Sequence, residues 1–343
     1  MQGSRAPVSG LGTATIGDRT AVVVARGDHV LDLDRHAADL GLAPGFSTRD
    51  LLDEWDARLP IVRDLAATAQ GWLPVREVTV RAPIEPRQLL QAGANYRTHV
   101  IDLHVAHAAV LDDATGAPAP DATASRAEAA RLMDERAATG EPYLFVGLPS
   151  AITGPYDDVA LPAGTESADW ELELVAVIGR ETFRVTADEA PDHVAAYTIA
   201  NDLTIRDLVF RNDMPRIGTD WFRSKNAPGF LPLGPWLVPA DEVGDPADLR
   251  MTLALNGEVM QDESTKDMVF DVAALVAAAS RTARLLPGDL LLTGSPAGNG
   301  MHHGRLLREG DVMEGSITRL GTQRTRVVAE QATQPQHTTR TAT

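Results

Sequence analysis

The chain has 343 residues, 44% of them hydrophobic, and a formal net charge of −17. This length suits one large domain with a smaller appendage, or two domains, and the acidic charge argues against nonspecific nucleic-acid binding. Cysteine is absent, which excludes disulfides and thiolate catalysis. No leader pattern is recognisable and no apolar run approaches a membrane span, so we expect a cytoplasmic protein with no membrane partner.

Residues 1–84 carry short strand and helix signals. Two short strands surround a Gly-Asp turn within residues 13–25, and a third strand is expected at residues 30–34. Ser47 begins a helix whose apolar residues recur at helical spacing through about Ala67. No catalytic pattern occurs in this part of the sequence.

A strand at residues 91–96 leads into a turn, and a helix is predicted to begin near Thr98. His99 and Asp102 then lie three residues apart on one helical face. A carboxylate beside an imidazole stabilises the imidazolium and fixes the ring tautomer, so such a pair can deprotonate a water molecule. Taken alone, a His–Asp pair of this kind is more often structural.

Residues 100–140 form a segment of their own. A capping box at Ser125–Glu128 predicts the start of a helix that ends at Gly140. Within this segment the sequence also offers a second, weaker metal-site candidate, made of His104, His107, Asp112 and Asp113.

Residues 169–179 are predicted to form a strand, because they are rich in apolar and β-branched residues and end at a glycine. Side chains alternate along a strand, so Glu171 and Glu173 share one face. Two half-buried carboxylates side by side are costly unless a cation lies between them, and oxygen ligands favour a hard divalent ion. For Glu-x-Glu alone, a solvated strand face is the competing interpretation.

Asp202 ends a second predicted strand at residues 196–202. A capping box at Thr186–Glu189 predicts a short helix between the two strands. We expect the resulting strand–helix–strand crossover to bring Asp202 beside Glu171 and Glu173. Three carboxylates at neighbouring strand ends predict a Mg²⁺ site, for which Mn²⁺ and Ca²⁺ are the alternatives.

Further elements follow in the C-terminal half. Asn256-Gly257 predicts a hairpin, residues 271–283 a buried helix and residues 290–293 a buried strand. The glycines of residues 294–298 let backbone N–H groups approach a ligand closely. Residues 331–343 are polar and are expected to be disordered.

Several motifs follow one another in a fixed order over roughly residues 85–320. They are Gly93-Ala-Asn-Tyr-Arg-Thr-His99, Pro149-Ser-Ala-Ile-Thr-Gly-Pro155, Asp169-Trp-Glu-Leu-Glu173, Ala200-Asn-Asp-Leu-Thr-Ile-Arg-Asp207, Lys225, Pro232-Leu-Gly-Pro-Trp236, Leu255-Asn-Gly-Glu258, Pro287-Gly-Asp289 and Thr293-Gly-Ser-Pro-Ala-Gly298. This ordered set resembles the fumarylacetoacetate hydrolase family. The resemblance implies a mixed α/β, β-rich fold, with a small N-terminal α/β domain at residues 1–84, a curled, barrel-like catalytic sheet at residues 85–330, and a homodimer. Residues 100–140 would form a lid or an inert insertion.

The resemblance also implies a function. It points to a metal-dependent hydrolase that cleaves a C–C bond in an acylpyruvate or other 1,3-dicarbonyl acid through a metal-bound enolate. The matching positions are Glu171, Glu173 and Asp202 for the metal, His99 with Asp102 for activating water, Lys225 for stabilising the enolate, and Tyr96, Arg206, Val209 and Ser295 for contacting substrate. The guanidinium of Arg206 suits a substrate carboxylate, although a salt bridge to Asp207 or another acid is as plausible.

Three positions depart from the family pattern. Asp102 stands where the family has Glu, Gly147 where it has Lys, and Val209 where it has Gln. The lost lysine suggests a less anionic substrate or a cation supplied elsewhere. An apolar site also suits a reaction that needs no held water, so the alternative is an isomerase, decarboxylase or hydratase acting on a 2-keto or 2-hydroxy-dienoic acid. A non-catalytic binding protein is less favoured, because the three carboxylates, His99 and Lys225 are retained.

Overall fold

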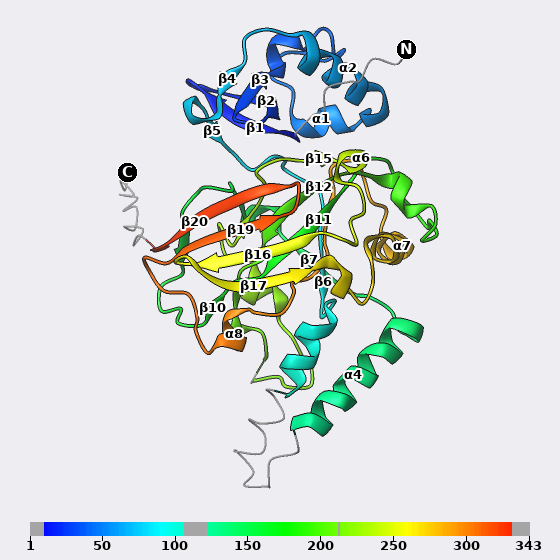
Figure 1. Ribbon diagram of the computed structural model, residues 1–343, viewed down its shortest axis with the longest axis vertical. Helices are drawn as coiled ribbons and strands as arrows, with labels where there is room; N and C mark the ends of the chain where they lie inside the picture. The colour runs from blue at the N-terminus through cyan, green and yellow to red at the C-terminus, as the bar shows by residue number, and fades with distance from the viewer. Residues whose placement is uncertain (1–9, 106–121, 212, 331–343) are drawn as a thin grey trace, which may run out of the picture.

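The computed structural model describes residues 10–105, 122–211 and 213–330. An antiparallel sheet forms the N-terminal part of the protein (Figure 1). Its spatial order is β4-β3-β2-β1-β5. The strands are β1 (Gly10–Ile16), β2 (Arg19–Arg26), β3 (His29–Asp32), β4 (Leu73–Pro74) and β5 (Thr79–Val80). The two strands predicted within residues 13–25 are therefore confirmed.

Two helices, α1 (Thr48–Leu52) and α2 (Trp55–Thr68), contribute apolar side chains to the core beside this sheet. Ser47 and Asp50 form a reciprocal capping box at the start of α1. The prediction of one helix from Ser47 to about Ala67 is wrong, because Glu54 leaves the helical conformation with φ −131° and ψ 49°.

The N-terminal sheet joins the larger part of the protein through β1. The main chains of Leu11 and Leu237 exchange hydrogen bonds of 2.8 and 2.7 Å. Gly12 lies against the ring of Trp236, where a Cβ would come within 2.8 Å of Cε3. One apolar cluster runs from α1 and α2 to the strands of the larger sheet. The domain boundary expected at residue 84 stays a prediction.

The larger part contains a six-stranded sheet in the order β15-β12-β11-β18-β6-β7. Neighbouring strands are antiparallel, except that β18 and β6 are parallel. Strands β11 and β12 are buried along their whole length, which explains their nearly continuous apolar sequences. The strands are β6 (Leu89–Gly93), β7 (Tyr143–Gly147), β11 (Leu172–Ile178), β12 (Val194–Asn201), β15 (Val238–Pro239) and β18 (Leu290–Leu292).

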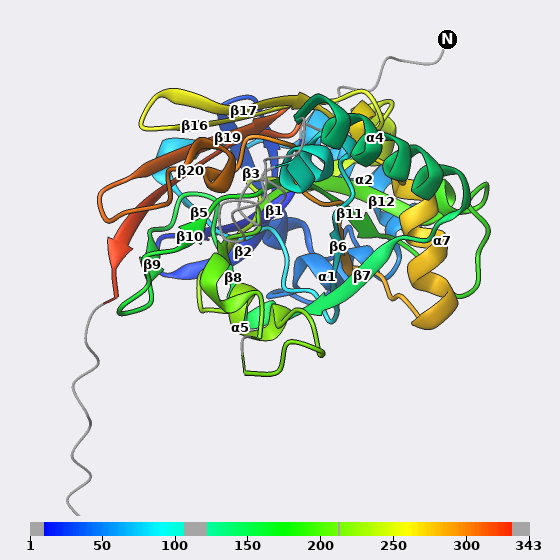
Figure 2. The same ribbon diagram turned by 90° about the horizontal axis from the view of Figure 1, so that it is seen from below.

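A second sheet, in the order β17-β16-β19-β20-β9, packs against the first to give a curled half-barrel (Figure 1, Figure 2). The mixed α/β, β-rich fold class is confirmed. The strands of this sheet are β9 (Val159–Leu161), β16 (Arg250–Leu255), β17 (Glu258–Ser264), β19 (Val312–Ile317) and β20 (Gly321–Ala329). Two short pairs complete the strands, namely β8 (Ile152–Thr153) with β14 (Leu231–Pro232) and β10 (Ala168–Asp169) with β13 (Thr204–Ile205).

Most helices of the larger part are short. They are α4 (Ala122–Thr139), α5 (Trp221–Lys225), α6 (Ala240–Val243), α7 (Val272–Thr282) and α8 (Gly300–His303), and residues 97–105 are also helical. Short 3₁₀ helices lie at Leu33–His36, Val75–Glu77, Pro149–Ala151, Ala190–His193, Arg206–Leu208 and Thr265–Asp267. Helix α7 agrees with its prediction, whereas α4 begins before the predicted capping box. In Figure 1, α4 lies at the end of the molecule away from the N-terminal sheet.

The connection between the two carboxylate-bearing strands differs from the prediction. Strands β11 and β12 are antiparallel neighbours, so the chain returns beside itself instead of crossing over as parallel strands require. Residues 106–121, which include His107, Asp112 and Asp113, and the tail at 331–343 lie outside the described residues. In the described part of the chain, no helix is both long and apolar enough to cross a membrane.

Candidate metal centre and active site

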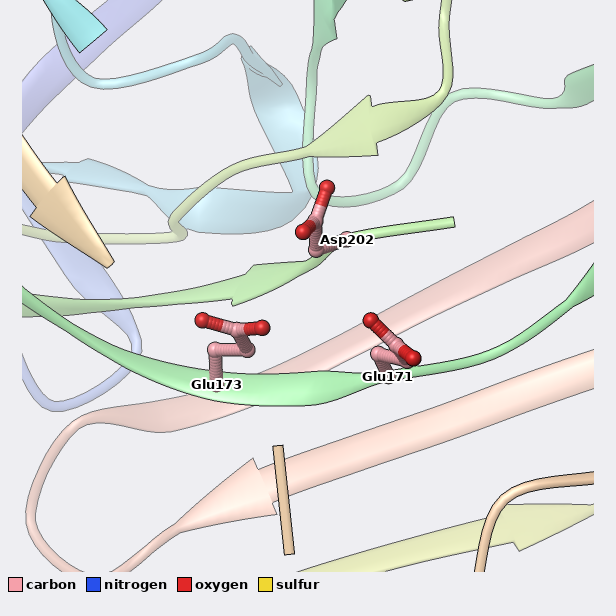
Figure 3. A group of neighbouring side chains, drawn as sticks. All are labelled: Glu171, Glu173 and Asp202. Atoms are coloured by element: carbon pink, nitrogen blue, oxygen red, sulfur yellow. The ribbon is translucent and has the colours of Figure 1, made fainter. Parts of the chain in front are cut away.

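Glu171, Glu173 and Asp202 meet where β11 begins and β12 ends. The antiparallel register pairs Leu172 with Asn201, which brings Glu171 next to Asp202. The Asp202 N–H donates to the Glu171 carbonyl at 2.8 Å, and strand alternation places Glu173 on the same face as Glu171. Figure 3 shows the three side chains gathered at this point, and one oxygen from each lies within 4.8 Å of the others.

Burial distinguishes this cluster from a solvated strand face. Glu171 is 8% exposed, and Glu173 and Asp202 are each 2% exposed. A buried carboxylate that stays ionised needs a cation or hydrogen-bond donors to replace its water. The interpretation of Glu-x-Glu as an exposed pattern is therefore wrong for this protein.

Lys225, at the end of α5, supplies one cation to the cluster. Its Nζ donates to Glu171 Oε2 at 2.7 Å, to Asp202 Oδ2 at 2.5 Å and to Thr204 Oγ1 at 2.8 Å. Burial opposes the ammonium charge, but the facing carboxylates of Asp202 and Glu171 outweigh it and raise the pKa of Lys225. Lys225 is thus buried and uses all three of its N–H donors within the cluster.

The three carboxylates differ in their partners. Burial raises the pKa of Glu171, but Lys225 and Arg206 outweigh burial and lower it to about 2. Burial, assisted by the charge of Glu171, raises the pKa of Asp202 to about 6 despite Lys225. Burial and the nearby Asp202 raise the pKa of Glu173 well above its usual range, although the N–H of Gly294 donates to Glu173 Oε2 at 2.7 Å.

Arg206 supplies the second cation. Its Nη2 lies 2.8 Å from Glu171 Oε1 and 2.7 Å from Asp169 Oδ2, and its Nε donates to Asp169 at 2.7 Å. Asp169 is fully buried and also accepts from the N–H of Gly300 at 2.5 Å. Arg206 therefore forms salt bridges with acids other than Asp207, and its role toward a substrate carboxylate stays a prediction.

The formal charges of this region do not balance. Four buried carboxylates, at Asp169, Glu171, Glu173 and Asp202, face two cations, at Arg206 and Lys225, which leaves two negative charges. One divalent cation would neutralise them. Because the cluster offers carboxylate oxygens alone, it fits a hard ion such as Mg²⁺, Mn²⁺ or Ca²⁺.

His99 and Asp102 lie on the helical segment at residues 97–105. Burial lowers the pKa of His99 to about 4, although the charge of Glu171 opposes this shift. Asp102 Oδ1 accepts from Arg126 Nη1 of α4 at 2.6 Å, and Asp102 Oδ2 lies 3.8 Å from His302 Nδ1 of α8. Arg126 and His302 were not foreseen as neighbours of Asp102.

The other residues predicted to contact substrate are Tyr96, Val209 and Ser295, and each has different neighbours. Tyr96 is fully buried and its hydroxyl donates to Met251 Sδ at 3.2 Å. Val209 is 5% exposed. Ser295 Oγ accepts from Gln261 Nε2 at 3.0 Å and directly follows Gly294, the donor to Glu173. The substrate-binding roles of Tyr96, Val209 and Ser295 stay predictions.

Gln91 is a site residue that the sequence reasoning missed. Its Nε2 donates to Asp202 Oδ1 at 2.7 Å, and the residue is 2% exposed. Its signal in the sequence is a polar residue inside the otherwise apolar strand β6. A buried polar side chain in such a strand needs a partner, and here the partner is Asp202.

Comparison with known proteins agrees with this geometry. The family profile "Fumarylacetoacetate (FAA) hydrolase C-terminal" matches residues 88–328. The mitochondrial oxaloacetate tautomerase FAHD2A of Bos taurus is 35% identical over 275 residues, which cover 79% of this chain and 76% of the relative. The 2,4-didehydro-3-deoxy-L-rhamnonate hydrolase of Sphingomonas sp. (strain SKA58) is 45% identical over 190 residues, covering 54% of this chain and 65% of the relative.

A solved structure provides a further comparison. The maleylpyruvate hydrolase of Sphingobium sp. SYK-6, determined in complex with manganese(II) and pyruvate, has a TM-score of 0.70 and 25% sequence identity. The match covers 94% of this chain and 100% of that one. Relatives of this chain thus include hydrolases and tautomerases, and one of them holds a divalent metal. The chain belongs to the fumarylacetoacetate hydrolase family.

Proposed function

We propose that this protein is a divalent-metal-dependent hydrolase that cleaves a C–C bond in an acylpyruvate or another 1,3-dicarbonyl acid. The observation that carries this proposal is the buried cluster of Glu171, Glu173 and Asp202, with two negative charges that the neighbouring cations leave unbalanced. The relatives named as hydrolases of maleylpyruvate and of a didehydro-deoxy sugar acid support this substrate class.

The metal ion proposed for the site is Mg²⁺. Its support is the all-carboxylate ligand set, because hard oxygen ligands suit Mg²⁺ and also Mn²⁺ and Ca²⁺. When bound, the ion would supply a Lewis acid and a template for a 2-oxo acid. The manganese in the related maleylpyruvate hydrolase makes Mn²⁺ the first alternative to test.

We assign His99 the role of general base. Its lowered pKa keeps the imidazole neutral near pH 7, so a ring nitrogen is free to accept a proton from water. Asp102, held by Arg126, lies on the same helical segment and would favour the protonated form of His99 once the proton has moved.

Lys225 is assigned to the negative charge that develops on a substrate oxygen when the C–C bond breaks. Its three donors are engaged by Glu171, Asp202 and Thr204. One of these bonds must therefore be released before the ammonium can bind substrate, and Thr204 is the neutral acceptor among them.

A second candidate function is isomerisation, tautomerisation, decarboxylation or hydration of a 2-keto or 2-hydroxy-dienoic acid at the same site. The observation that favours it is the buried, apolar Val209, which supplies no hydrogen bond for an attacking water. The oxaloacetate tautomerase relatives support it as well.

One experiment separates these reactions. The metal-stripped protein is supplied with Mg²⁺, Mn²⁺ or Ca²⁺ and assayed against acylpyruvates, β-keto acids and oxaloacetate in H₂¹⁸O. Hydrolysis predicts ¹⁸O in the released carboxylate and loss of turnover with chelator. Turnover without ¹⁸O in a cleaved product would assign the second candidate function, and activity that survives Glu173→Ala would reject both.

We further propose a cytoplasmic homodimer. The support is an exposed apolar surface around α5 and β7, and β7 is an edge strand of the six-stranded sheet. This α5–β7 surface consists of Tyr143, Val146, Leu148, Phe210, Met214, Ile217 and Phe222, each more than a third exposed. Exposed apolar side chains beside the edge strand of a sheet are typical of protein interfaces.

A further inference from the structure

We propose that Gln91 is a positioning residue that holds the Asp202 carboxylate for metal binding, and that the glycine at position 147 is what permits it. The inference rests on the metal site of the proposed function and concerns residues that contact its ligands.

The two oxygens of Asp202 are held by different donors. Gln91 Nε2 donates to Oδ1 at 2.7 Å, while Lys225 Nζ donates to Oδ2 at 2.5 Å. Gln91 comes from β6, Lys225 from α5 and Asp202 from the end of β12. Two donors on separate elements fix the plane of the carboxylate and restrict its rotation.

The pairing of β6 with β7 places Gly147 beside the Gln91 side chain. Gly147 lies opposite Leu89 in the antiparallel register, and Leu89 and Gln91 share one face of β6. A Cβ at position 147 would lie 2.6 Å from Gln91 Oε1 and 2.8 Å from Leu89 Cδ2. Both atoms are ends of movable side chains, so a larger residue at 147 would displace the Gln91 amide without breaking the strand pair.

The amide orientation follows from the charge of Asp202. Gln91 Oε1 is buried and has no hydrogen-bond partner among the described residues, whereas Nε2 is bonded to the carboxylate. Reversing the amide would place two oxygens against each other. The donor group is therefore the part of Gln91 that the site uses.

A neutral donor has a consequence that a lysine would not have. The Gln91 amide orients Asp202 but leaves both unbalanced negative charges of the cluster in place for a divalent ion. An ammonium group in place of the Gln91 amide would cancel one of these two negative charges and would repel the divalent ion. The Gln91–Gly147 pair thus combines a fixed ligand with the full charge that attracts a divalent cation.

The test is calorimetric titration of the full-length, metal-stripped protein with Mn²⁺. Gln91→Leu removes the donor at similar volume, Gly147→Ala displaces it, and Val259→Ala, at an exposed position of β17, is the control. We expect Kd for Mn²⁺ to rise about tenfold or more in the first two variants and not in the control, as for other hydrogen bonds to metal ligands. The double variant Gln91→Leu with Gly147→Ala should lose little more than either single variant, because both remove one hydrogen bond.

Two further readouts separate positioning from a general structural effect. Thermal unfolding in chelator shows whether each variant is folded, and saturating Mn²⁺ should restore most of the turnover. An unchanged Kd in Gln91→Leu, or losses that add fully in the double variant, would overturn the inference while leaving the metal site intact. Failure of the wild-type protein to bind Mn²⁺, Mg²⁺ or Ca²⁺ would overturn the proposed function and the inference together.

Discussion

Lys225 and Asp202 are joined by a hydrogen bond of 2.5 Å between Nζ and Oδ2. The same nitrogen lies 2.7 Å from Glu171 Oε2. The residue proposed to stabilise charge on the substrate therefore also binds two proposed metal ligands. Metal binding and the action of Lys225 are linked through shared oxygens, and several measurable consequences follow from this link.

Replacing Lys225 by Ala should destabilise the metal-free protein by about 3–5 kcal/mol, because removing one partner of a buried ion pair leaves an uncompensated charge. Denaturant unfolding in chelator measures this loss, and added Mn²⁺ should recover part of it. Lys266→Ala is the control, since Lys266 is the chain's other lysine and its ion pair with Asp248 is exposed. Equal stabilities for the Lys225 variant and wild type would contradict the buried-pair interpretation.

Replacing Glu173 by Gln removes a proposed ligand with little change of shape. Because burial and Asp202 raise the pKa of Glu173, its charge is unfavourable without metal, so the variant should be at least as stable as wild type in chelator at pH 7. Its Kd for Mn²⁺ should rise by about 100-fold or more, beyond the loss typical of outer-shell partners. Glu258→Gln, at an exposed position of β17, serves as the control in both measurements.

The stability of the metal-free protein should depend on pH through Asp202. An acid whose folded pKa is raised, here from 3.8 to about 6, costs stability as pH rises through that window, because the unfolded chain releases the proton first. The cost is of the order of 3 kcal/mol above pH 6. Asp202→Asn should lack this component, so the stability difference between variant and wild type should grow from pH 4 to pH 6. Parallel stability curves would count against the raised pKa.

At saturating Mn²⁺, the fall of kcat/KM on the acid side of the pH profile should lie at low pH. If neutral His99 is the base, kcat/KM should fall as pH drops through about 4, the lowered pKa of His99, and not near 6.5. His99→Gln should abolish turnover. His303→Gln is the control and should keep the position of the limb, since the exposed ring of His303 lies against the main-chain carbonyl of Met260, 3.0 Å from Nε2. A limb near 6.5 in the wild type would argue against buried His99 as the base.

The proposed homodimer predicts a specific effect at the α5–β7 surface. Phe222 is 69% exposed in α5, and Phe222→Asp would bury a charge in the interface, so sedimentation velocity should show monomers. Val259→Asp places the same charge at a 58% exposed apolar position of β17 and should leave the dimer intact. A monomeric wild-type protein would contradict the proposal.

The motifs were recognisable without coordinates because local sequence encodes them. Asn256-Gly257 does connect β16 and β17, and Asp271 does cap α7. Where local signals conflicted, the sequence reasoning failed: it continued one helix through Glu54 and began α4 at a capping box inside that helix. Both errors concern where an element begins or ends, which depends on packing as well as on propensity.

The sequence by itself determined that Glu171 and Glu173 share a face, because strand periodicity is a property of neighbouring residues. It also supplied Asp202 and Lys225 as partners through the ordered motifs. The tertiary structure alone decided that β11 and β12 run antiparallel. It also decided that Lys225 donates to Glu171, Asp202 and Thr204. Only the tertiary structure shows that Gln91, beside Gly147, donates to Asp202. These contacts join residues far apart in the chain, and their geometry is set by how the two sheets and α5 pack, which no local pattern records.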